Sequence, residues 1–359
     1  MPRFEPFQAL RYRRNIELHD VCSPPYDVLS DADRLALATW HEDNIVHIDM
    51  PVSAAGNAYE HAASILNQWI SDGVLVRDET PSFTLYRMRF TDSTGKPRNV
   101  VGVIGALEVV DEGAGGVLPH ERTTPKAKTD RLDLTIATHA NLSPVWGLSL
   151  TSGLTAALSE PGEVVAQCTD EEGVHHVLER VSDPARIAAI SRLVSESPVL
   201  IADGHHRYAI SRTFRDQSRI AGNPQGAELT MTYVAELVQE QLSVAAIHRL
   251  YDIDNASLIS VLSSHYDTSD AGRVGPHTIS EMDSRGSLCL VAPDGTGTYL
   301  TTRADTFVGV REMDSARLEH ALRNTEHSVS YQHGVTEVVN KLAAGVAASA
   351  ILIRPVSLA

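Results

Sequence analysis

The feature that most limits the fold of this chain is a short apolar segment that ends directly in a polar turn. Residues 198–202 read Pro-Val-Leu-Ile-Ala, a run that is typical of a buried strand. The segment Asp203–Arg207, with the sequence Asp-Gly-His-His-Arg, follows it, and helical spacing of apolar residues resumes over 206–218. This order predicts a buried strand, a tight turn and the start of a helix.

The residue types in this turn suit phosphate chemistry. Gly204 permits a tight turn with close approach of the backbone, and a helix start offers unpaired N–H groups and a positive dipole end. Arg207 can hold two phosphate oxygens at once, and His205 or His206 can add donors. Asp203 is suited to holding Mg²⁺ or to orienting a hydroxyl group. The turn therefore predicts a site for a phosphorylated ligand.

Two other interpretations of the same residues remain open. Asp203 could cap the helix while the histidines form a polar cluster in the core. Alternatively, Asp203, His205 and His206 could bind a metal in a hydrolase, although neighbouring side chains diverge and zinc ligands on a helix usually lie four residues apart.

Length and charge set the class of protein and its partners. With 359 residues, we expect two or three packed subdomains, and a content of 43% hydrophobic and 21% charged residues is typical of globular proteins. The formal net charge of −16 argues against nucleic acid as the main partner but permits a small phosphorylated ligand in a local basic pocket.

Cysteine usage and hydropathy indicate the compartment. The cysteines Cys22, Cys168 and Cys289 are far apart in sequence, which predicts neither a disulfide framework nor a zinc site. The first residues contain no apolar run typical of a signal peptide, and no segment approaches the ~18 apolar residues needed to span a bilayer. We therefore expect a cytoplasmic protein with no membrane partner.

The periodicity of apolar residues predicts a mixture of helices and strands. Helices are expected at 57–72, 126–138, 183–195, 206–218, 255–264, 314–324 and 335–346. Strands are expected at 83–90, 100–110, 144–150, 163–168, 174–181, 198–202, 228–238, 243–251 and 350–354. The turn-rich residues 92–97 predict a hairpin between the first two strands.

These elements predict an α+β (mixed α/β) protein with antiparallel or mixed sheets. We expect an N-terminal α/β segment at 1–80, a catalytic core at 81–252 and a C-terminal α/β subdomain at 253–359. The neighbourhood of Asp252–Asp254 and a loop at 268–278 are the candidate boundaries.

A second polar segment contains Pro119, His120 and Glu121. Pro119 stiffens the chain, so the carboxylate that follows would project from a defined position. By itself a single Glu is usually a solvated surface residue, and so are the charged residues at 126–133 that follow it.

The two segments together resemble the signatures of ParB/sulfiredoxin-like kinases that phosphorylate free serine. The resemblance implies that Glu121 is the general base toward the substrate hydroxyl and that Asp203 assists it. It also implies that nucleotide phosphates, with Mg²⁺ at Asp203, are bound by Gly204, His205, His206, Arg207 and His120. The implied fold is a ParB-like core.

The spacing of the two segments differs from that of compact kinases of this kind, in which they lie closer together. Here 82 positions separate Glu121 from Asp203. The resemblance then implies that residues of about 145–195 form an inserted sheet and helix that leave both motifs facing one cleft.

Most of the chain also resembles a family of uncharacterised bacterial proteins, DUF1015. The matching stretches, in order, are Pro6-Phe7, Leu10-Arg11-Tyr12, Pro24–Val28, Asn44–Val46 with Asp49, Pro119–Glu121, Asp130–Leu132, Asn141–Pro144, Asp203–Tyr208 and His248-Arg249. Members of this family often continue into a Lys/Ser/Thr-rich tail, so groups that help to close the site could follow Ala359.

Four further residues are candidates for the substrate site. Tyr26 and Asp27 follow two prolines, and such a rigid loop could hold them against a substrate or be a structural turn. Asn141 could fix a loop between helix and strand, and Arg249 at a strand end could add positive charge near a phosphate.

The sequence leaves three functions open. The first is a small-molecule kinase that transfers a phosphoryl group from ATP or ADP, with Mg²⁺, to a hydroxyl, with free L-serine as the best acceptor. The second is a ParB-like nucleotide-binding or nucleotide-hydrolysing regulator, and the third is a metal-dependent hydrolase. The expected partners are a small-molecule substrate and a nucleotide, and a homodimer is compatible with these observations.

Overall fold

The computed structural model divides the chain into two compact units. It describes residues 1–354 except 27–28, 53–55, 93–94, 120–127, 171–172, 225 and 239–245. The first unit comprises residues 1–90 and 99–241, and the second comprises residues 91–98 and 242–359. The sequence placed the start of the C-terminal subdomain at 253, whereas the structural division lies at 241–242.

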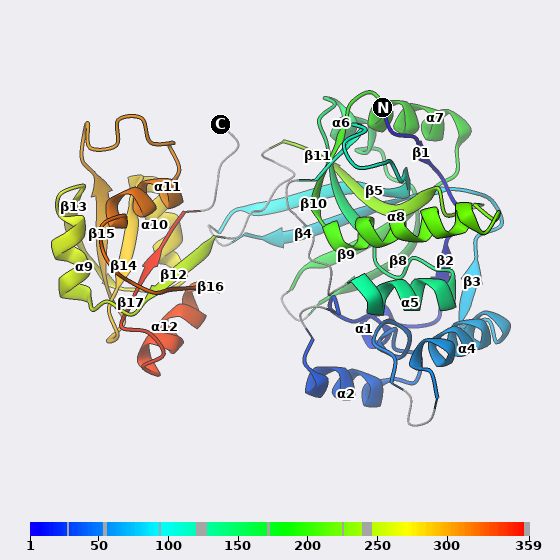
Figure 1. Cartoon of the computed structure of the whole chain (residues 1–359), viewed down its shortest axis with the longest axis horizontal. Helices are drawn as coiled ribbons and strands as arrows, with labels where there is room; N and C mark the ends of the chain where they lie inside the picture. The colour runs from blue at the N-terminus through cyan, green and yellow to red at the C-terminus, as the bar shows by residue number, and fades with distance from the viewer. Residues whose placement is uncertain are drawn as a thin grey trace. The chain divides into compact units, whose positions relative to one another are not determined.

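A nine-stranded sheet forms the centre of the first unit (Figure 1). Its strands are β1 (Phe4–Glu5), β4 (Phe83–Thr91), β5 (Pro97–Glu108), β6 (Val117–Leu118), β7 (Val145–Ser149), β8 (Glu163–Thr169), β9 (His175–Val181), β10 (Val199–Asp203) and β11 (Leu229–Glu236). The order is β6-β10-β7-β11-β5-β4-β9-β8, with β1 added to β5. Strand β10 is parallel to β6 but antiparallel to β7, so the sheet is mixed, as predicted.

Three of the helices of the first unit begin at a polar side chain that caps them. The helices of this unit are α1 (Leu18–Val21), α2 (Asp31–Trp40), α3 (Val46–Asp49), α4 (Ala58–Ser71), α5 (Lys128–Thr138), α6 (Leu154–Ala157), α7 (Pro184–Ser195) and α8 (His205–Ile220). Ser30 caps α2, Asn57 caps α4 and Asp183 caps α7 by accepting backbone N–H groups. Pro184 occupies the first turn of α7, where no hydrogen bond is lost.

Three of these helices pack in a row beside the sheet. Helix α4 packs against α5, and α5 packs against α8, which also contacts β7 and β11 (Figure 1). A small ladder of β2 (Leu10–Tyr12) and β3 (Leu75–Arg77) lies next to α4. This row fixes the first turn of α8 relative to the residues that follow α5.

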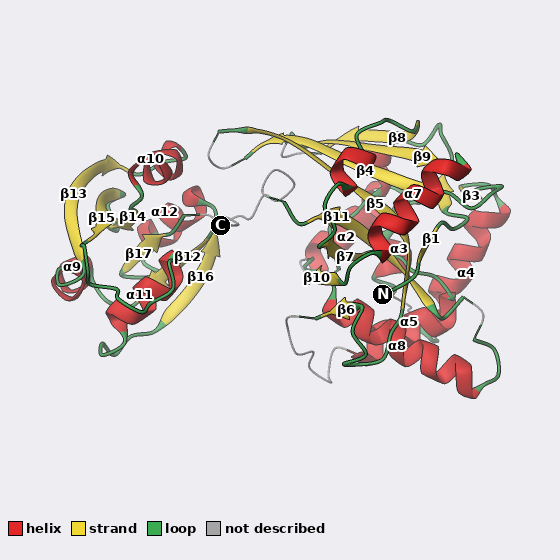
Figure 2. Cartoon of the chain, turned by 90° about the horizontal axis from the view of Figure 1, so that it is seen from above, coloured by secondary structure: helices red, strands yellow, loops and turns green. Residues whose placement is uncertain are grey.

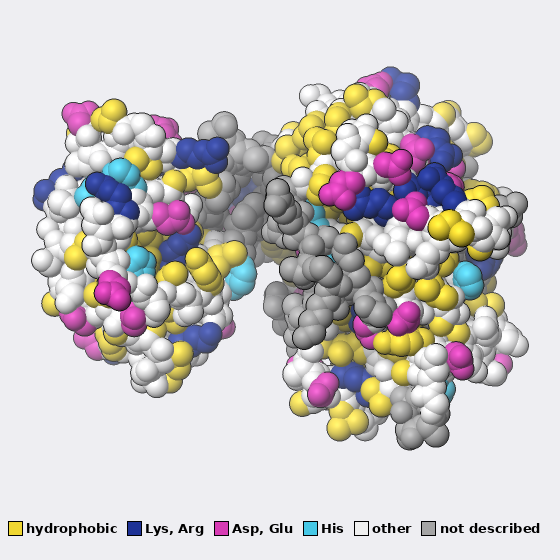
Figure 3. All heavy atoms as spheres, in the orientation of Figure 1, with side chains coloured by type: hydrophobic (Ala, Val, Ile, Leu, Met, Phe, Trp, Pro, Cys, Tyr) yellow, Lys and Arg dark blue, Asp and Glu magenta, His cyan; other side chains and the backbone are white. Residues whose placement is uncertain are grey.

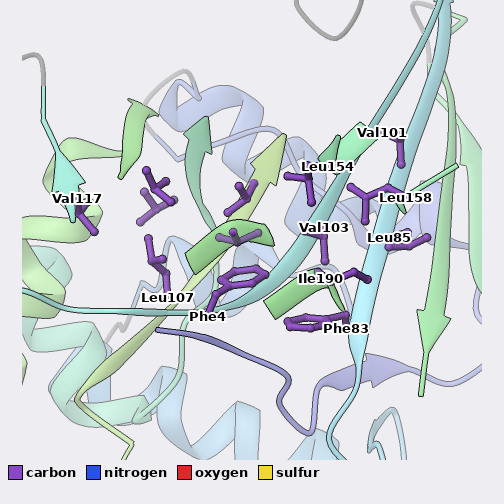
Figure 4. Close-up of a cluster of buried hydrophobic side chains, with 14 of the residues drawn as sticks. Phe4, Phe83, Leu85, Val101, Val103, Leu107, Val117, Leu154, Leu158 and Ile190 are labelled. Atoms are coloured by element: carbon purple, nitrogen blue, oxygen red, sulfur yellow. The ribbon is translucent and has the colours of Figure 1, made fainter. Parts of the chain in front are cut away.

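Two stacked aromatic rings lie in the main hydrophobic core of the first unit. Phe4 and Phe83 stack with ring centroids 5.0 Å apart and planes inclined by 11° (Figure 4). Both are fully buried among aliphatic side chains from β5, α6 and α7. A Cβ on Gly105 would lie 2.4 Å from the Phe4 ring, so this position of β5 must be glycine.

The second unit is built around a six-stranded antiparallel sheet (Figure 2). Its order is β13-β15-β14-β17-β12-β16. The strands are β12 (Ile247–Tyr251), β13 (Tyr266–Arg273), β14 (Leu288–Val291), β15 (Thr296–Thr302), β16 (Val329–His333) and β17 (Ser349–Leu352). Helices α9 (Asn255–Leu262), α10 (His277–Arg285), α11 (Asp314–Leu322) and α12 (Val335–Ala343) accompany them, and two separate buried clusters fill the space between helices and sheet.

One predicted boundary differs from the observed fold. Residues 268–278, suggested as a boundary loop, contribute to β13 and to the start of α10. The segment 145–195 contains strands and a helix, and its strands join the main sheet: β7 lies inside the nine-stranded sheet, and β8 and β9 extend its edge. In the part of the chain that the structure describes, no helix is both long and apolar enough to cross a membrane.

Candidate functional site

The Asp203–Arg207 segment forms the strand–turn–helix that the sequence predicts. Strand β10 ends at Asp203, which lies opposite Trp146 of β7 after a shift in register that follows Ile201. Gly204 has φ = 84°, a left-handed conformation that strongly favours glycine, and α8 begins at the next residue. The turn thus lies at the end of a strand with other strands on both sides.

The start of α8 has no side-chain cap among the described residues. Its N-cap residue is Gly204, and Asp203 does not act as the cap that one interpretation of the sequence required. The first N–H groups of an α-helix have no partner within the helix, and they carry the positive end of its dipole. This arrangement is suited to an anion.

Arg207 holds the turn together from inside the helix. Its Nη2 donates to Asp203 Oδ2 at 2.5 Å, and its Nη1 donates to the carbonyl oxygen of Pro144. The Arg207 side chain is 19% exposed, whereas that of Asp203 is 62% exposed. Arg207 therefore braces the turn and the start of β7, and its guanidinium has further N–H donors besides the two used in these bonds.

The two histidines have different surroundings. His205 is buried, with 8% of its surface exposed, and has interactions within the fold. His206 is half-buried, and its Nδ1 is enclosed without a hydrogen-bond partner in the described structure. Among the described residues, the ring of His206 thus has a nitrogen that makes no hydrogen bond within the fold.

Helix α8 is tied firmly to the end of β5. The Tyr208 hydroxyl donates to the carbonyl of Glu108 and accepts from the N–H of Val110, both at 2.9 Å. Burial raises the pKa of Tyr208, so its hydroxyl remains protonated at neutral pH. Arg215 is 2% exposed and donates to the Val109 carbonyl.

Ion pairs continue along α8. Arg215 bonds Asp111 at 2.5 Å, and Arg219 bonds Glu228 at 2.6 Å. Lys/Arg and Asp/Glu side chains consequently alternate in a band over this helix (Figure 3). The helix that carries the turn is anchored along its length.

Substitution of Gly204 tests how strongly the turn depends on this geometry. A Cβ there would lie 3.1 Å from Arg207 Nε and 3.3 Å from Val145 Cα, in addition to the left-handed backbone. We expect Gly204→Ala to lower the free energy of unfolding by about 2–3 kcal/mol, measured by urea denaturation.

Gly222, at the other end of α8, provides the matched control. It also has a positive φ, 74°, but a Cβ there would meet no atom within 4 Å. Gly222→Ala should therefore lower the free energy of unfolding only by the cost of the left-handed backbone, about 1–2 kcal/mol. Equal losses at the two positions would show that packing against Arg207 does not matter.

A small pocket of about 60 Å³ lies beside the turn, within the first unit. It brings together three predicted site residues, Tyr26, Asn141 and Arg207. The sequence analysis missed the other polar residues of its lining, which are Asp49, Arg131, Thr135, Ser143, Ser211 and Thr230. The signal was present for Asp49, Arg131 and Ser143, because they belong to the stretches that match the family.

Three of the other predicted residues are not described by the structure, and a fourth belongs to the second unit. Asp27, His120 and Glu121 lie outside the described residues. Arg249 belongs to the second unit, where it lies on β12, 3.8 Å from a Glu319 carboxylate oxygen and over the Tyr331 ring. Among the described residues no group of three or more His, Cys, Asp or Glu side chains could hold a metal ion.

The fold and the site define a two-unit α+β protein with an uncapped helix start at a strand end and an arginine-lined pocket beside it. The chain belongs to the family described as a protein of unknown function (DUF1015), whose family model matches residues 4–325. No curated protein matches the chain.

Solved structures of a free serine kinase are similar to part of the chain. A mutant of that kinase in complex with AMP is 11% identical with a TM-score of 0.30, and the match covers 68% of this chain and 75% of the kinase. The kinase in complex with AMP is 10% identical with a TM-score of 0.29 and the same coverage. A mutant in complex with ADP is 12% identical with a TM-score of 0.29, and the match covers 67% of this chain and 74% of the kinase. Scores this low do not establish a common fold.

Proposed function

We propose that this protein transfers a phosphoryl group from a nucleotide to the hydroxyl of a small molecule, with free L-serine as the first acceptor to test. The observation that carries the proposal is the uncapped start of α8 at Gly204, next to the exposed carboxylate of Asp203. Backbone N–H groups and the helix dipole at such a position stabilise phosphate charge.

Some residues of the turn would bind phosphate, and others would hold the binding groups in position. The N–H groups that follow Gly204 and the half-buried ring of His206 would contact phosphate oxygens. Arg207 would keep Asp203 in place and add positive charge. Glu121, assigned by resemblance to the kinase motif, would accept the proton of the attacking hydroxyl.

A magnesium ion is compatible with this arrangement. Mg²⁺ in nucleotide sites is usually held by one or two carboxylates together with the phosphates and water. Asp203 is mostly exposed and uses Oδ2 for Arg207, which leaves Oδ1 as the oxygen that could face such an ion. The ion would neutralise phosphate charge.

The Asp203–Arg207 ion pair also favours a second candidate function, a nucleotide-binding regulator. A phosphate that displaced Asp203 from Arg207 would open the turn and could change its contact with Pro144 at the start of β7. This function requires nucleotide binding but no phosphorylated metabolite.

The deciding experiment is mass spectrometry of products after incubation with ATP or ADP, Mg²⁺ and a panel of amino acids that includes serine. We expect O-phosphoserine. Nucleotide binding by calorimetry without any phosphorylated product would support the regulator, and the absence of both would refute both functions.

The base assignment is tested by Glu121→Gln. Removing the proton acceptor while keeping the shape should lower the turnover number about 10²- to 10⁴-fold, with nucleotide affinity unchanged. Glu112→Gln is the control, because Glu112 lies nine residues earlier and its side chain is 83% exposed. A normal rate for Glu121→Gln would exclude Glu121 as the base.

A further inference from the structure

The pocket beside the turn has a polar wall built from elements that are distant in sequence. Arg131 comes from α5, Asn141 from the loop after it, and Ser211 from α8, with Thr230 contributed by β11. The volume of about 60 Å³ has room for roughly four water-sized groups, enough for one end of a small molecule.

Arg131 is fixed in position by its neighbours. Its Nη1 donates to the carbonyl and the Oδ1 of Asp49 at 2.7 and 2.9 Å, and its guanidinium lies 3.5 Å from the centre of the Tyr26 ring. Its Nε is enclosed and has no hydrogen-bond partner in the described structure, the Asp130 carboxylate being 3.6 Å away. Arg131 thus keeps donor capacity while its side chain is held rigidly.

Asn141 presents its amino group because its amide oxygen is already engaged. The Oδ1 of Asn141 accepts from Thr230 Oγ1 at 2.9 Å and from the N–H of Met231 at 3.4 Å. Thr230 in turn lies 2.8 Å from Ser211 Oγ. These bonds fix the orientation of the amide, so that Nδ2 remains as a donor.

The charges of the lining suit a ligand group with one negative charge. Arg131 and Arg207 are cationic and Asp49 is anionic, which leaves a formal charge of +1 in the lining. Asp203, which is bonded to Arg207, is not part of this lining. A nucleotide polyphosphate would bring several negative charges that this lining does not compensate, whereas a carboxylate brings one.

We propose that this pocket binds the carboxylate of the phosphoryl acceptor, with Arg131 and Asn141 as its donors. The inference rests on the proposed function and narrows it to amino acids or hydroxy acids. Because Arg207 lines the pocket and also bonds Asp203, a ligand held there has its other end close to the turn. Planar carboxylates and guanidinium groups match in geometry.

Equilibrium binding without nucleotide tests the proposal. By calorimetry, we expect L-serine or D-glycerate to bind at least about tenfold more tightly than L-serinamide or glycerol, which lack the carboxylate. Arg131→Met should weaken carboxylate binding about tenfold or more. Arg192→Met, on an arginine that is 67% exposed on α7, should leave it unchanged.

A second variant keeps the test decisive if Arg131→Met does not fold, because that substitution also removes the bonds to Asp49. Asn141→Asp replaces a donor by a negative charge at a more exposed position and should also weaken carboxylate binding. Equal affinity for L-serine and L-serinamide, no binding of either carboxylate, or unchanged binding in a folded Arg131→Met protein would overturn the proposal.

Two outcomes separate this proposal from the proposed kinase. Carboxylate binding that depends on Arg131, without any phosphorylated product, would refute the kinase and leave the pocket assignment intact. Phosphorylation of glycerol as efficiently as of serine would refute the pocket assignment alone. If inorganic phosphate competed with L-serine, and this competition were lost in Arg131→Met, the pocket would be a phosphate site. That result would overturn the assignment of the pocket to a carboxylate.

Discussion

Replacing Asp203 by Asn is expected to lower the rate of phosphoryl transfer about 10²- to 10⁴-fold at saturating nucleotide and acceptor. The change removes one negative charge at the strand end while the size of the side chain is kept. Asn can still accept the hydrogen bond from Arg207, so the turn should remain folded. Steady-state kinetics of the purified variant would measure the loss as a decrease in kcat.

The matched control is Glu196→Gln. Glu196 forms an i,i+4 ion pair with Arg192 of α7, as Asp203 does with Arg207, but it lies at the end of α7 and not in the turn. Its loss should leave kcat unchanged. If Asp203→Asn lowered only the nucleotide affinity and left kcat unchanged, the Asp203 carboxylate would contribute to nucleotide binding and not to the chemical step.

Local signals in the sequence predicted the elements around the site well. Helix α7 has an aspartate cap and a proline in its first turn, and both signals are contained in four residues. Strand β10 and α8 were predicted because an apolar run, a glycine and a helical period follow one another directly. These features depend on neighbours in sequence and not on tertiary contacts.

Two of the elements that were missed bury little surface. Strand β13 carries the polar sequence Tyr-Asp-Thr-Ser-Asp-Ala-Gly-Arg and has no apolar alternation, since it is an edge strand that pairs with β15 alone. Helix α2 has no buried residue and is specified by its capping box. Periodicity cannot reveal elements that bury little surface.

The site was predicted only as far as its contiguous motif. The sequence identified the turn, but it could not show that Arg207 bonds the Pro144 carbonyl or that Arg131 meets Tyr26 and Asp49. Those contacts join residues that are more than about 60 positions apart in the sequence, so tertiary packing brings them together. Arg131 was therefore taken for part of a solvated helix face.

The largest expected effect on stability is at Glu179, in the ion pair with Arg87 between β9 and β4. The two side chains are 6% and 9% exposed, and Arg87 Nε lies 3.0 Å from both carboxylate oxygens. Glu179→Gln leaves a buried guanidinium without its counter-charge. We expect a loss of about 3–5 kcal/mol in the free energy of unfolding, measured by urea denaturation.

The control is Glu163→Gln on the adjacent strand β8. Glu163 pairs with Arg180 of β9 at 2.6 Å, but its side chain is 47% exposed, so water can replace the pairing and the loss should be much smaller. Comparable losses for the two variants would contradict the role of burial.

The double replacement Arg87→Met with Glu179→Leu separates the ion pair from the hydrogen bonds around it. An isolated buried pair can often be exchanged for apolar residues with little loss. Here Arg87 also donates to the Leu158 carbonyl at 2.6 Å, and Glu179 accepts from the N–H of Gly162 at 3.0 Å. The double variant should therefore remain destabilised, because these backbone groups lose their partners in a buried environment.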